Sequence, residues 1–311
     1  MDTQNGTDAL VTKRTQRRHS MASSKEMGSK MSKQITVVTT FHPAGLSKYG
    51  QRFLDSFAAR VDKRIKLLVY AEDCKPNNPD PSRIEILDAK QVLPKLNQFK
   101  ATWGHVPKAN GDVSNEPQRH TRKDWMKEFK WDAVRFANKT YAVYDAVQRS
   151  KGWCVWMDAD TFVHSNWSYE QFKELLPENA YITYVGRGKG SQTWPECGFY
   201  GLNLNHPGCH EFLKEFERMY EDAENGMFLL DEWHDSYIFG EVLKMFNQFP
   251  SHDYSADMYL KEAKSGGGGH PLINGPLGKW IDHMKGARKE EGSSRSKDIM
   301  VNRTEDYWRN K

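Results

Sequence analysis

Apolar residues recur along most of this chain with strand-like and helix-like spacing in turn. The β-branched run ITVVTTF at 35–41 predicts a buried strand, and apolar residues three to four positions apart predict a helix over 46–61. Such alternation predicts an α/β domain whose sheet is mostly parallel, above all in its first half. Further strands are predicted at 64–73, 83–89, 154–157, 180–186 and 198–204, and further helices at 123–149, 167–177, 207–225 and 231–246.

Other segments lack this periodic spacing. Residues 100–121 contain Gly, Pro and Asn and predict a long loop, and the chain from about 265 onward is Gly-rich and irregular. Residues 1–34 are polar, carry a net charge of +4 and predict a disordered basic arm, which leaves a formally neutral body. We therefore predict a disordered arm at 1–34, one α/β domain at 35–290 and a tail at 291–311.

Composition narrows the class of protein and its compartment. Charged residues make up 28% of the 311-residue chain and aromatic residues 12%, which is typical of a globular protein. No apolar run approaches the length of a membrane span, and no N-terminal apolar region resembles a signal peptide. The four cysteines are scattered without a Cys-x-x-Cys pair, which argues against a zinc site and a disulfide framework. We expect a cytoplasmic protein.

The stretch GWCVWMDADTFVHSN at 152–166 brings two carboxylates to the end of a predicted strand. Alternate residues of a strand point the same way, so Asp158 and Asp160 reach toward one point if the extended conformation persists to Asp160. Two like charges this close repel each other unless a cation sits between them, and carboxylate oxygens suit Mn²⁺ or Mg²⁺. The alternative is that Asp158 caps a turn and Asp160 begins the next helix.

This Asp-x-Asp and the run HMKGARK at 283–289 resemble motifs of the GT-A glycosyltransferases, which have a Rossmann-like sheet flanked by helices. In those enzymes an Asp-x-Asp after a central strand holds a divalent metal on the diphosphate of a sugar nucleotide. Retaining members of the glycogenin and lipopolysaccharide-galactosyltransferase type also carry His-x-x-Gly-x-x-Lys. The resemblance implies that His283 is the third metal ligand, that Gly286 permits close backbone approach and that Lys289 binds the phosphates.

Two features of this region depart from a simple match. The family pattern continues with Pro-Trp after the lysine, whereas this chain has Glu290 and Glu291. His270, in the Gly-rich stretch just before the motif, is a competing third ligand.

The resemblance also implies roles for residues on either side of the Asp-x-Asp strand. GT-A enzymes often use a basic residue of the preceding helix to orient the metal carboxylates or to hold the donor, and Arg135 and Lys139 are four residues apart on one face of that helix. A solvated face is the alternative for this pair. Glu196 stands where a polar residue contacts the donor sugar.

The run EWHDSYIF at 232–239 resembles the Trp-His-Asp-Glu-Ser run of the blood-group-type transferases. In those enzymes the Asp binds hydroxyls of the donor sugar and the Glu lies under the anomeric carbon. The resemblance implies catalytic roles for His234 and Asp235, but Ser236 occupies the position of the Glu, so no carboxylate nucleophile can be assigned there. Core packing is the favoured interpretation for Trp233 and Tyr237.

The carboxyl ends of the first two predicted strands are where this fold binds the base and ribose of a nucleotide. Turn formation is the alternative role for residues at these positions. The candidates are Thr39, Thr40 and Phe41 at the end of the first strand, Tyr49 as a stacking partner, and Glu72 and Asp73 at the end of the second strand.

Together the motifs predict a metal-dependent retaining transferase that moves a sugar from a nucleotide sugar, with UDP as the expected nucleotide. The leaving diphosphate gains negative charge, which a metal and a lysine stabilise. A glycan or a lipid-linked sugar is the expected acceptor. A hydroxymethylated DNA base is the alternative, suggested by the basic arm and by a basic cluster at 119–123, but the neutral body argues against it.

Two other classes of protein stay open. A sugar-nucleotide-binding protein without turnover would not need Asp158, Asp160, His283 and Lys289 intact. A nucleotidyltransferase also uses paired aspartates and a metal, but it usually has a Gly-rich phosphate loop where this chain has HPAGLSKYG.

Overall fold

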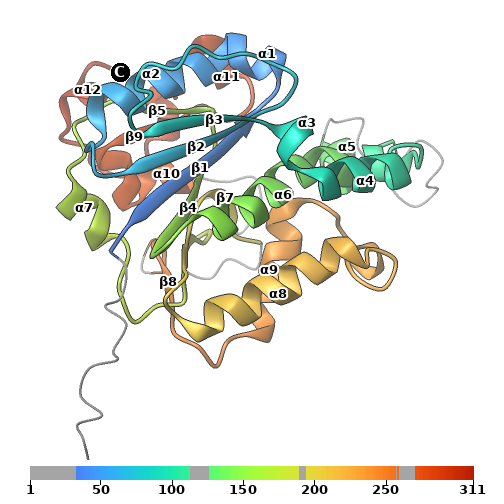
Figure 1. The fold of residues 1–311 in the computed structure, drawn as a ribbon. Coiled ribbons are helices and arrows are strands. Elements are labelled where there is room, and N and C mark those ends of the chain that lie inside the picture. Colours follow the sequence, from blue (N-terminus) through green and yellow to red (C-terminus); the bar gives the residue numbers. More distant parts are fainter. Residues whose placement is uncertain (1–32, 113–125, 189–193, 257, 259–269) are drawn as a thin grey trace, which may run out of the picture. The chain divides into compact units, whose positions relative to one another are not determined.

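A sheet of seven strands runs through the part of the chain that the computed structural model describes, which is residues 33–112, 126–188, 194–256, 258 and 270–311 (Figure 1). Its strand order is β3-β2-β1-β4-β7-β6-β8. β7 is antiparallel to both of its neighbours, and the other four pairs are parallel. These strands are β1 (Ile35–Phe41), β2 (Lys66–Ala71), β3 (Ile84–Asp88), β4 (Trp153–Met157), β6 (Ile182–Val185), β7 (Glu196–Asn203) and β8 (Ser251–Asp253).

Helices cover both faces of the sheet. The longer ones are α2 (Gln51–Arg60), α4 (Pro94–Trp103), α6 (Ala133–Arg149), α8 (Pro207–Glu221) and α9 (Asp235–Met245). The shorter ones are α1 (Pro43–Gly45), α3 (Ala89–Val92), α5 (Met126–Trp131), α7 (Tyr169–Glu174), α10 (Pro271–Asn274), α11 (Arg288–Glu291) and α12 (Asp306–Arg309).

Two apolar cores hold these layers together, one on each face of the sheet. Val37 of β1 packs on one face with Phe53 and Phe57 of α2. Val38 points to the other face, where α4, α6, α8 and α9 contribute the core. Strands covered on both faces are expected to be buried along their length, and six of the seven residues of β1 are buried. The predicted fold class, a mostly parallel α/β sheet flanked by helices, is confirmed, and it is consistent with a GT-A, Rossmann-like fold.

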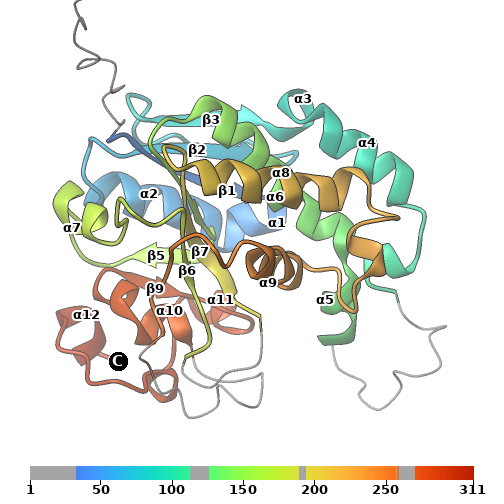
Figure 2. The same ribbon diagram turned by 90° about the horizontal axis from the view of Figure 1, so that it is seen from below.

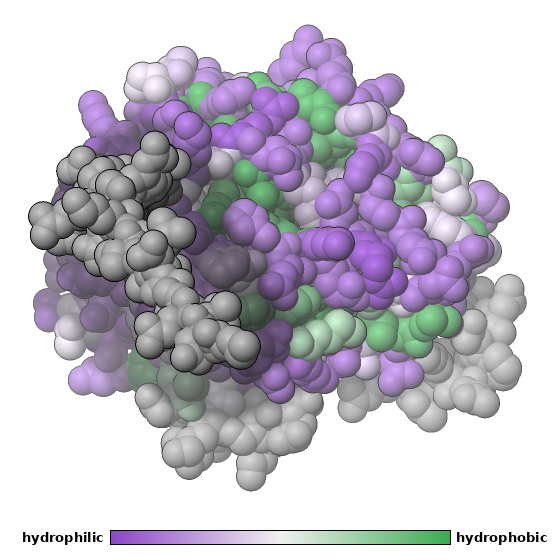
Figure 3. Space-filling view, turned by 60° about the horizontal axis from the view of Figure 1, so that its bottom comes forward, coloured by the Kyte–Doolittle hydropathy of each residue, from purple (hydrophilic) through white to green (hydrophobic). Residues whose placement is uncertain are grey.

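Few large apolar side chains of the described residues are exposed at the surface. On the face that Figure 3 shows, hydrophobic residues are interspersed with hydrophilic ones. Among the described residues, the exposed large hydrophobic ones are Leu229, Met245 and Val301.

Two of the predicted helices are less regular than expected. The helix expected over 123–149 is divided, because α5 ends at Trp131 and the side chain of Asp132 caps α6 by accepting a hydrogen bond from the amide of Arg135. The helix expected over 46–61 opens with a π-helical turn, η1 (Leu46–Gly50), before α2. A π-helical turn often marks a functional site, because it changes the direction of the side chains it carries.

Part of the loop predicted at 100–121 is helical, since α4 continues to Trp103 and a 3₁₀ turn, η2 (Lys108–Asn110), follows. Residues 113–121 of that loop lie outside the described residues. So do the basic cluster of Arg119, His120, Arg122 and Lys123 and almost all of the arm at 1–34.

The last fifth of the chain is not irregular as predicted, because it contains several short elements. β5 (Thr161–Val163) and β9 (Ile281–His283) form a separate antiparallel pair in which Thr161 faces His283. Figures 1 and 2 both show β5 and β9 beside α10, α11 and α12. Strands of three residues are too short to produce a periodic signal in the sequence, which explains why this pair was not predicted.

The segment predicted as a tail, 291–311, packs against this pair of strands. The hydroxyl of Tyr307 donates a hydrogen bond of 2.6 Å to buried Asp282 of β9. The indole of Trp308, which is itself buried, donates to the carbonyl of Gly278 at 2.6 Å. Residues 32–311 accordingly form one compact unit. Within its described part, none of the helices combines the length and the apolar character needed to cross a bilayer.

Candidate metal and donor-binding site

A turn brings the two carboxylates of the Asp-x-Asp together. β4 ends at Met157, the amide of Asp158 donates to the carbonyl of Gly198, and the amide of Thr161 donates back to the carbonyl of Asp158 at 3.2 Å. The extended conformation therefore does not persist to Asp160, and neither residue begins a helix. The condition under which strand geometry would aim both side chains the same way is therefore not met, because the chain turns here to start β5.

The β5–β9 pair adds a histidine to these carboxylates. Its register places His283 opposite Thr161, and the amide of Met284 donates to the carbonyl of Asp160 at 2.8 Å. The Nε2 atom of His283 lies 3.2 Å from Oδ1 of Asp160 and 3.7 Å from Oδ2 of Asp158. The three residues predicted as metal ligands thus meet at one point, although they come from two segments some 120 residues apart.

These three side chains form a set of ligands that a divalent cation could occupy. One ligand atom from each residue lies within 4.8 Å of the other two. His283 and Asp160 are buried, and two carboxylate oxygens with one imidazole nitrogen leave room for further oxygen ligands. His270 is not part of this group; its ring packs edge-on against His283 with the centroids 5.3 Å apart.

The electrostatics of these side chains reflect this crowding. Burial alone would lower the pKa of His283, but the carboxylates of Asp160 and Asp158 outweigh it and raise that pKa to about 10. Burial would raise the pKa of both carboxyl groups, but Lys139 and His283 lower it for Asp158, and His283 and Lys289 lower it for Asp160. The site therefore keeps both carboxylates ionised and holds a positive charge between them.

Lys289 lies at the edge of this site. Its Nζ atom is 2.8 Å from Oδ2 of Asp160 and 5.0 Å from the centre of the Tyr49 ring, which η1 carries. Gly286, three residues earlier, has a φ of 62°, a conformation that favours glycine. No atom of the described structure lies within 4 Å of the position a Cβ would take there. Lys289 thus contacts a carboxylate of the metal-ligand group, and Gly286 permits a turn that other residues rarely adopt.

Lys139 of α6 connects Asp158 to a third carboxylate. Its Nζ atom lies 3.3 Å from Asp158 and 2.7 Å from Asp235, the first residue of α9, and it also donates to the carbonyl of Cys197. Lys139 is buried, so it fixes the position of both carboxylates. Arg135 does not share this environment, because its side chain is exposed and pairs with Asp132 at 3.4 Å.

Glu196, at the start of β7, is a buried carboxylate with two cationic partners. Nη1 of Arg187 lies 2.9 Å away and Nζ of Lys285 lies 2.6 Å away. Burial alone would raise the pKa of Glu196, but these two cations hold it well below its usual value. Lys285 follows His283 by two residues, so this cluster is tied directly to the metal-ligand segment.

The neighbours of Asp235 have structural contacts. His234 is fully buried and caps α9, because its Nδ1 accepts a hydrogen bond from the amide of Tyr237 while its Nε2 lies 3.0 Å from Glu232. A catalytic role for His234 stays a prediction, and both of its ring nitrogens are occupied here. Trp233 is buried against Phe228, in line with core packing.

The residues predicted to contact the nucleotide lie at the ends of β1 and β2. The hydroxyl of Thr40 is 2.7 Å from both the carbonyl of Tyr70 and the carboxyl group of Glu72. Thr39 and Phe41 are buried in the sheet. Asp73 has a positive φ of 51°, which is uncommon for a residue other than glycine. Their nucleotide contacts stay predictions.

Sequence reasoning missed three residues that shape the site. Arg187 directly follows a predicted strand and Lys285 lies inside the His-x-x-Gly-x-x-Lys run, but no spacing rule links either to Glu196. Gly198 leaves room for the ligands, since a Cβ there would lie 3.2 Å from Cε1 of His283 and 3.3 Å from Oδ2 of Asp158. A glycine within a predicted strand is the one available signal of such close approach.

Comparisons with known proteins add little to this geometry. No protein-family model matches the chain, and no curated protein sequence matches it. Among solved structures, the apo form of mouse xyloside xylosyltransferase 1 is similar, with a TM-score of 0.41 and 12% identity over 70% of this chain and 84% of that one. A likeness at this level does not bear on function, which has to be argued from the site.

Proposed function

We propose that this protein is a metal-dependent glycosyltransferase that moves a sugar from a nucleoside diphosphate sugar to an acceptor hydroxyl with retention of configuration. UDP is the proposed nucleotide and Mn²⁺ or Mg²⁺ the proposed ion. The observation that carries the proposal is the convergence of Asp158, Asp160 and His283, with Lys289 at 2.8 Å from Asp160. A diphosphate bound there would contact a cation and a lysine together.

The charges of the site support a dianionic ligand. Among the described residues of the site, four carboxylates are matched by four cationic side chains. The carboxylates are those of Asp158, Asp160, Glu196 and Asp235, and the cations are those of Lys139, Arg187, Lys285 and Lys289. A divalent ion bound by neutral His283 would leave an excess of two positive charges. The diphosphate of a nucleotide sugar carries two negative charges, whereas a nucleoside triphosphate carries more. This balance favours a sugar nucleotide over the substrate of a nucleotidyltransferase.

In the proposed reaction the bond between the anomeric carbon and the diphosphate oxygen breaks, and its electron pair leaves with the nucleoside diphosphate. The acceptor oxygen bonds to the anomeric carbon on the same face and its proton passes to the departing diphosphate. A bound divalent ion would supply charge stabilisation on the leaving group. Lys289 would add to it. Ser236, where related enzymes carry Glu, supports this front-face route over a covalent intermediate.

A screen of sugar nucleotides labelled in the sugar tests the proposal. With Mn²⁺ present, we expect one UDP-sugar to be hydrolysed slowly to free sugar and UDP, and EDTA to abolish this activity. Asp160→Asn should abolish it as well, whereas Asp145→Asn, at a carboxylate that accepts from Tyr70 and lies outside the cluster, should not. Release of sugar phosphate and UMP would instead show that the phosphoanhydride bond is cleaved, and it would contradict a glycosyl transfer.

The nature of the acceptor stays a prediction. A glycan or lipid-linked sugar is the first proposal, and a hydroxymethylated base in DNA is the second. Because the basic arm and the cluster at 119–123 lie outside the described residues, the DNA proposal rests on sequence alone. Transfer of the labelled sugar to hydroxymethylcytosine-containing DNA, compared with unmodified DNA, would decide between them.

A further inference from the structure

One oxygen of Asp158 is bonded to an indole of the strand that precedes it. Trp156 lies in β4, two residues before Asp158, and its Nε1 donates a hydrogen bond of 2.6 Å to Oδ1 of that carboxylate. A hydrogen bond to an ionised carboxylate is shorter and stronger than one between neutral groups. An indole nitrogen can only donate, so Trp156 interacts favourably with the charged form of Asp158. This contact fixes the orientation of the carboxylate.

The indole itself is held firmly. Trp156 is 2% exposed and packs in the core on the α6 side of the sheet, where Nζ of Lys139 lies 4.8 Å from the centre of a ring of the indole. Lys139 also reaches Oδ1 of Asp158, at 3.3 Å, but it lies nearer to Asp235, at 2.7 Å. Of these two contacts with Oδ1, the shorter is that of the indole. Trp156 is therefore the better placed of the two residues to orient Asp158.

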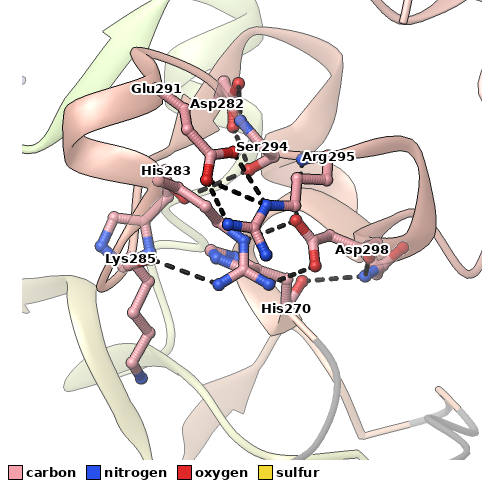
Figure 4. A network of polar contacts seen from close by, with 10 residues as sticks. His270, Asp282, His283, Lys285, Glu291, Ser294, Arg295 and Asp298 are labelled. Atoms are coloured by element: carbon pink, nitrogen blue, oxygen red, sulfur yellow. Dashed lines mark hydrogen bonds and ion pairs between the residues drawn. The ribbon is translucent and has the colours of Figure 1, made fainter.

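The second oxygen of Asp158 faces the histidine of the metal-ligand group. Its Oδ2 lies 3.7 Å from Nε2 of His283. The backbone of His283 is fixed in turn, because the hydroxyl of Ser294 donates to Asp282 and lies 3.3 Å from the carbonyl of His283 (Figure 4). Because Oδ1 is bonded to the indole and His283 is fixed, Oδ2 is the oxygen of Asp158 that is presented to an ion beside His283.

A carboxylate with one oxygen occupied in this way offers an ion a single bond. Ca²⁺ accepts about six to eight oxygen ligands and binds carboxylates through one oxygen or through both. Mg²⁺ requires a nearly octahedral arrangement, and Mn²⁺ also binds octahedrally. The two oxygens of one carboxylate lie too close together to fill two octahedral positions well. Restricting a carboxylate to one oxygen therefore favours the smaller, octahedral ions.

We propose that Trp156 is a positioning residue that selects the ion. Its indole holds Oδ1 of Asp158, restricts this carboxylate to one metal bond through Oδ2, and so favours Mn²⁺ or Mg²⁺ over Ca²⁺. This inference rests on the proposed function, because it concerns the ion held by Asp158, Asp160 and His283. Trp156 belongs to neither motif of the sequence analysis, in which it is part of an apolar strand.

Titration of the full-length protein with Mn²⁺ tests the proposal without nucleotide or turnover. Electron paramagnetic resonance of the free ion measures Mn²⁺ affinity, and displacement of bound Mn²⁺ by Ca²⁺ gives the ratio of the two affinities. In Trp156→Phe, which removes the donor and keeps an aromatic ring, we expect Mn²⁺ affinity to fall by about tenfold. Ca²⁺ affinity should fall less, because the released carboxylate can bind Ca²⁺ through both oxygens.

Two further variants separate this effect from a packing defect. Trp153→Phe removes the same atoms from another buried residue of β4, which packs on the opposite face of the sheet. It should lower the free energy of unfolding in urea and leave both ion affinities unchanged. Replacement of Trp156 by 3-benzothienylalanine, in which sulfur takes the place of the N–H, removes the donor from a ring of nearly the same shape. It should reproduce the changes in both affinities that Trp156→Phe shows.

Several outcomes would overturn the inference. Wild-type affinities for both ions in the 3-benzothienylalanine variant would show that the indole N–H does not orient Asp158. Equal losses for Mn²⁺ and Ca²⁺ would show that it does not select the ion, and the same change in ratio in Trp153→Phe would identify a packing effect. If Asp160→Asn abolishes Mn²⁺ binding while the Trp156 variants leave it unchanged, this inference alone fails. If the wild-type protein binds no Mn²⁺, the proposed function fails with it.

Discussion

At the scale of single residues, His283 occupies a position that a cation could take. Its imidazole lies between the carboxylates of Asp158 and Asp160, which overcome the effect of burial and raise its pKa to about 10. A histidine must be neutral to bind a metal ion, so the ion has to displace a proton from this ring. From the sequence alone, the ring is expected to lose this proton near the ordinary pKa of histidine. The contacts seen in the structure raise the pKa at which it does so.

Proton release on metal binding follows from this arrangement. At pH 7.5 each bound Mn²⁺ should displace about one proton, and the affinity should rise with pH up to about 10. Calorimetric titration of Mn²⁺ in two buffers that differ in their enthalpy of ionisation measures the number of protons. An affinity that does not vary with pH, with no proton released, would contradict the position assigned to His283.

The same pKa shift predicts how the stability of the metal-free protein varies with pH. The pKa of His283 is higher in the folded protein than its ordinary value of 6.5, so the stabilisation is fully present below pH 6.5 and is lost as pH rises through about 10. In EDTA, His283→Asn should therefore lower the free energy of unfolding more at pH 6 than at pH 10. His252→Asn, at an exposed histidine, should show no such difference. An equal effect of His283→Asn at both pH values would argue against the shift.

At the scale of elements, the short β5–β9 pair assembles the metal-ligand group. β9 brings His283 to the turn after β4, and its other side is held by buried Asp282, which accepts hydrogen bonds from the amide of Ser294 at 2.9 Å and from the hydroxyl of Tyr307 at 2.6 Å. The C-terminal segment therefore anchors the strand that carries a predicted ligand.

Removing one of these anchors should loosen β9. Tyr307→Phe leaves buried Asp282 short of a donor and should lower the free energy of unfolding by about 1–2 kcal/mol, as measured by urea denaturation. Mn²⁺ affinity should fall with it. Tyr169→Phe is a suitable control, because the hydroxyl of Tyr169 donates to the backbone of Lys33 in an exposed position. Full stability and full Mn²⁺ affinity in Tyr307→Phe would mean that the segment does not support β9.

The elements also show how far the sequence could predict this structure. β1 and the strand that ends before Asp158 could be predicted because each contains enough β-branched or apolar residues to be recognised by itself. β5 and β9 could not be found this way, because three residues define no period. The break at Asp132 was missed because apolar spacing continues across α5 and α6 and a single capping residue interrupts it.

The candidate site was predictable only in part. The Asp-x-Asp and His-x-x-Gly-x-x-Lys spacings name residues that the fold does bring together, since each motif is local in sequence. The cluster around Glu196 depends on contacts between residues far apart in the chain, such as Lys285 and Glu196, for which a single sequence gives no rule. The sequence around His234 is compatible with a helix cap and with a catalytic histidine, so sequence reasoning could not distinguish the two roles.

At the scale of the whole molecule, the chain divides into an N-terminal unit of residues 1–31 and the unit of 32–311 that contains the candidate site. Deleting residues 1–30 should leave the melting temperature of the protein unchanged, because these polar residues have little apolar surface to bury. Differential scanning calorimetry of the truncated and full-length proteins measures this. A melting temperature several degrees lower would show that the arm is part of the folded domain.

The arm also bears on the acceptor. If DNA is the acceptor, the truncated protein should bind DNA more weakly than the full chain, and the difference should shrink as salt is raised, because phosphate contacts weaken steeply with salt. Equal DNA binding by both proteins at every salt concentration would show that the arm does not contribute to DNA binding.

We infer that Asp158, Asp160 and His283 together hold a divalent ion on the diphosphate of a nucleotide. A crystal structure with Mn²⁺ and UDP, in which anomalous scattering locates the ion, tests it most directly. We predict one Mn²⁺ bound by both carboxylates and by Nε2 of His283 at about 2.1–2.3 Å, a little longer than a zinc–nitrogen bond, with Lys289 turned from Asp160 to the diphosphate. An ion bound without His283, or a UDP whose phosphates lie away from Asp158 and Asp160, would contradict it.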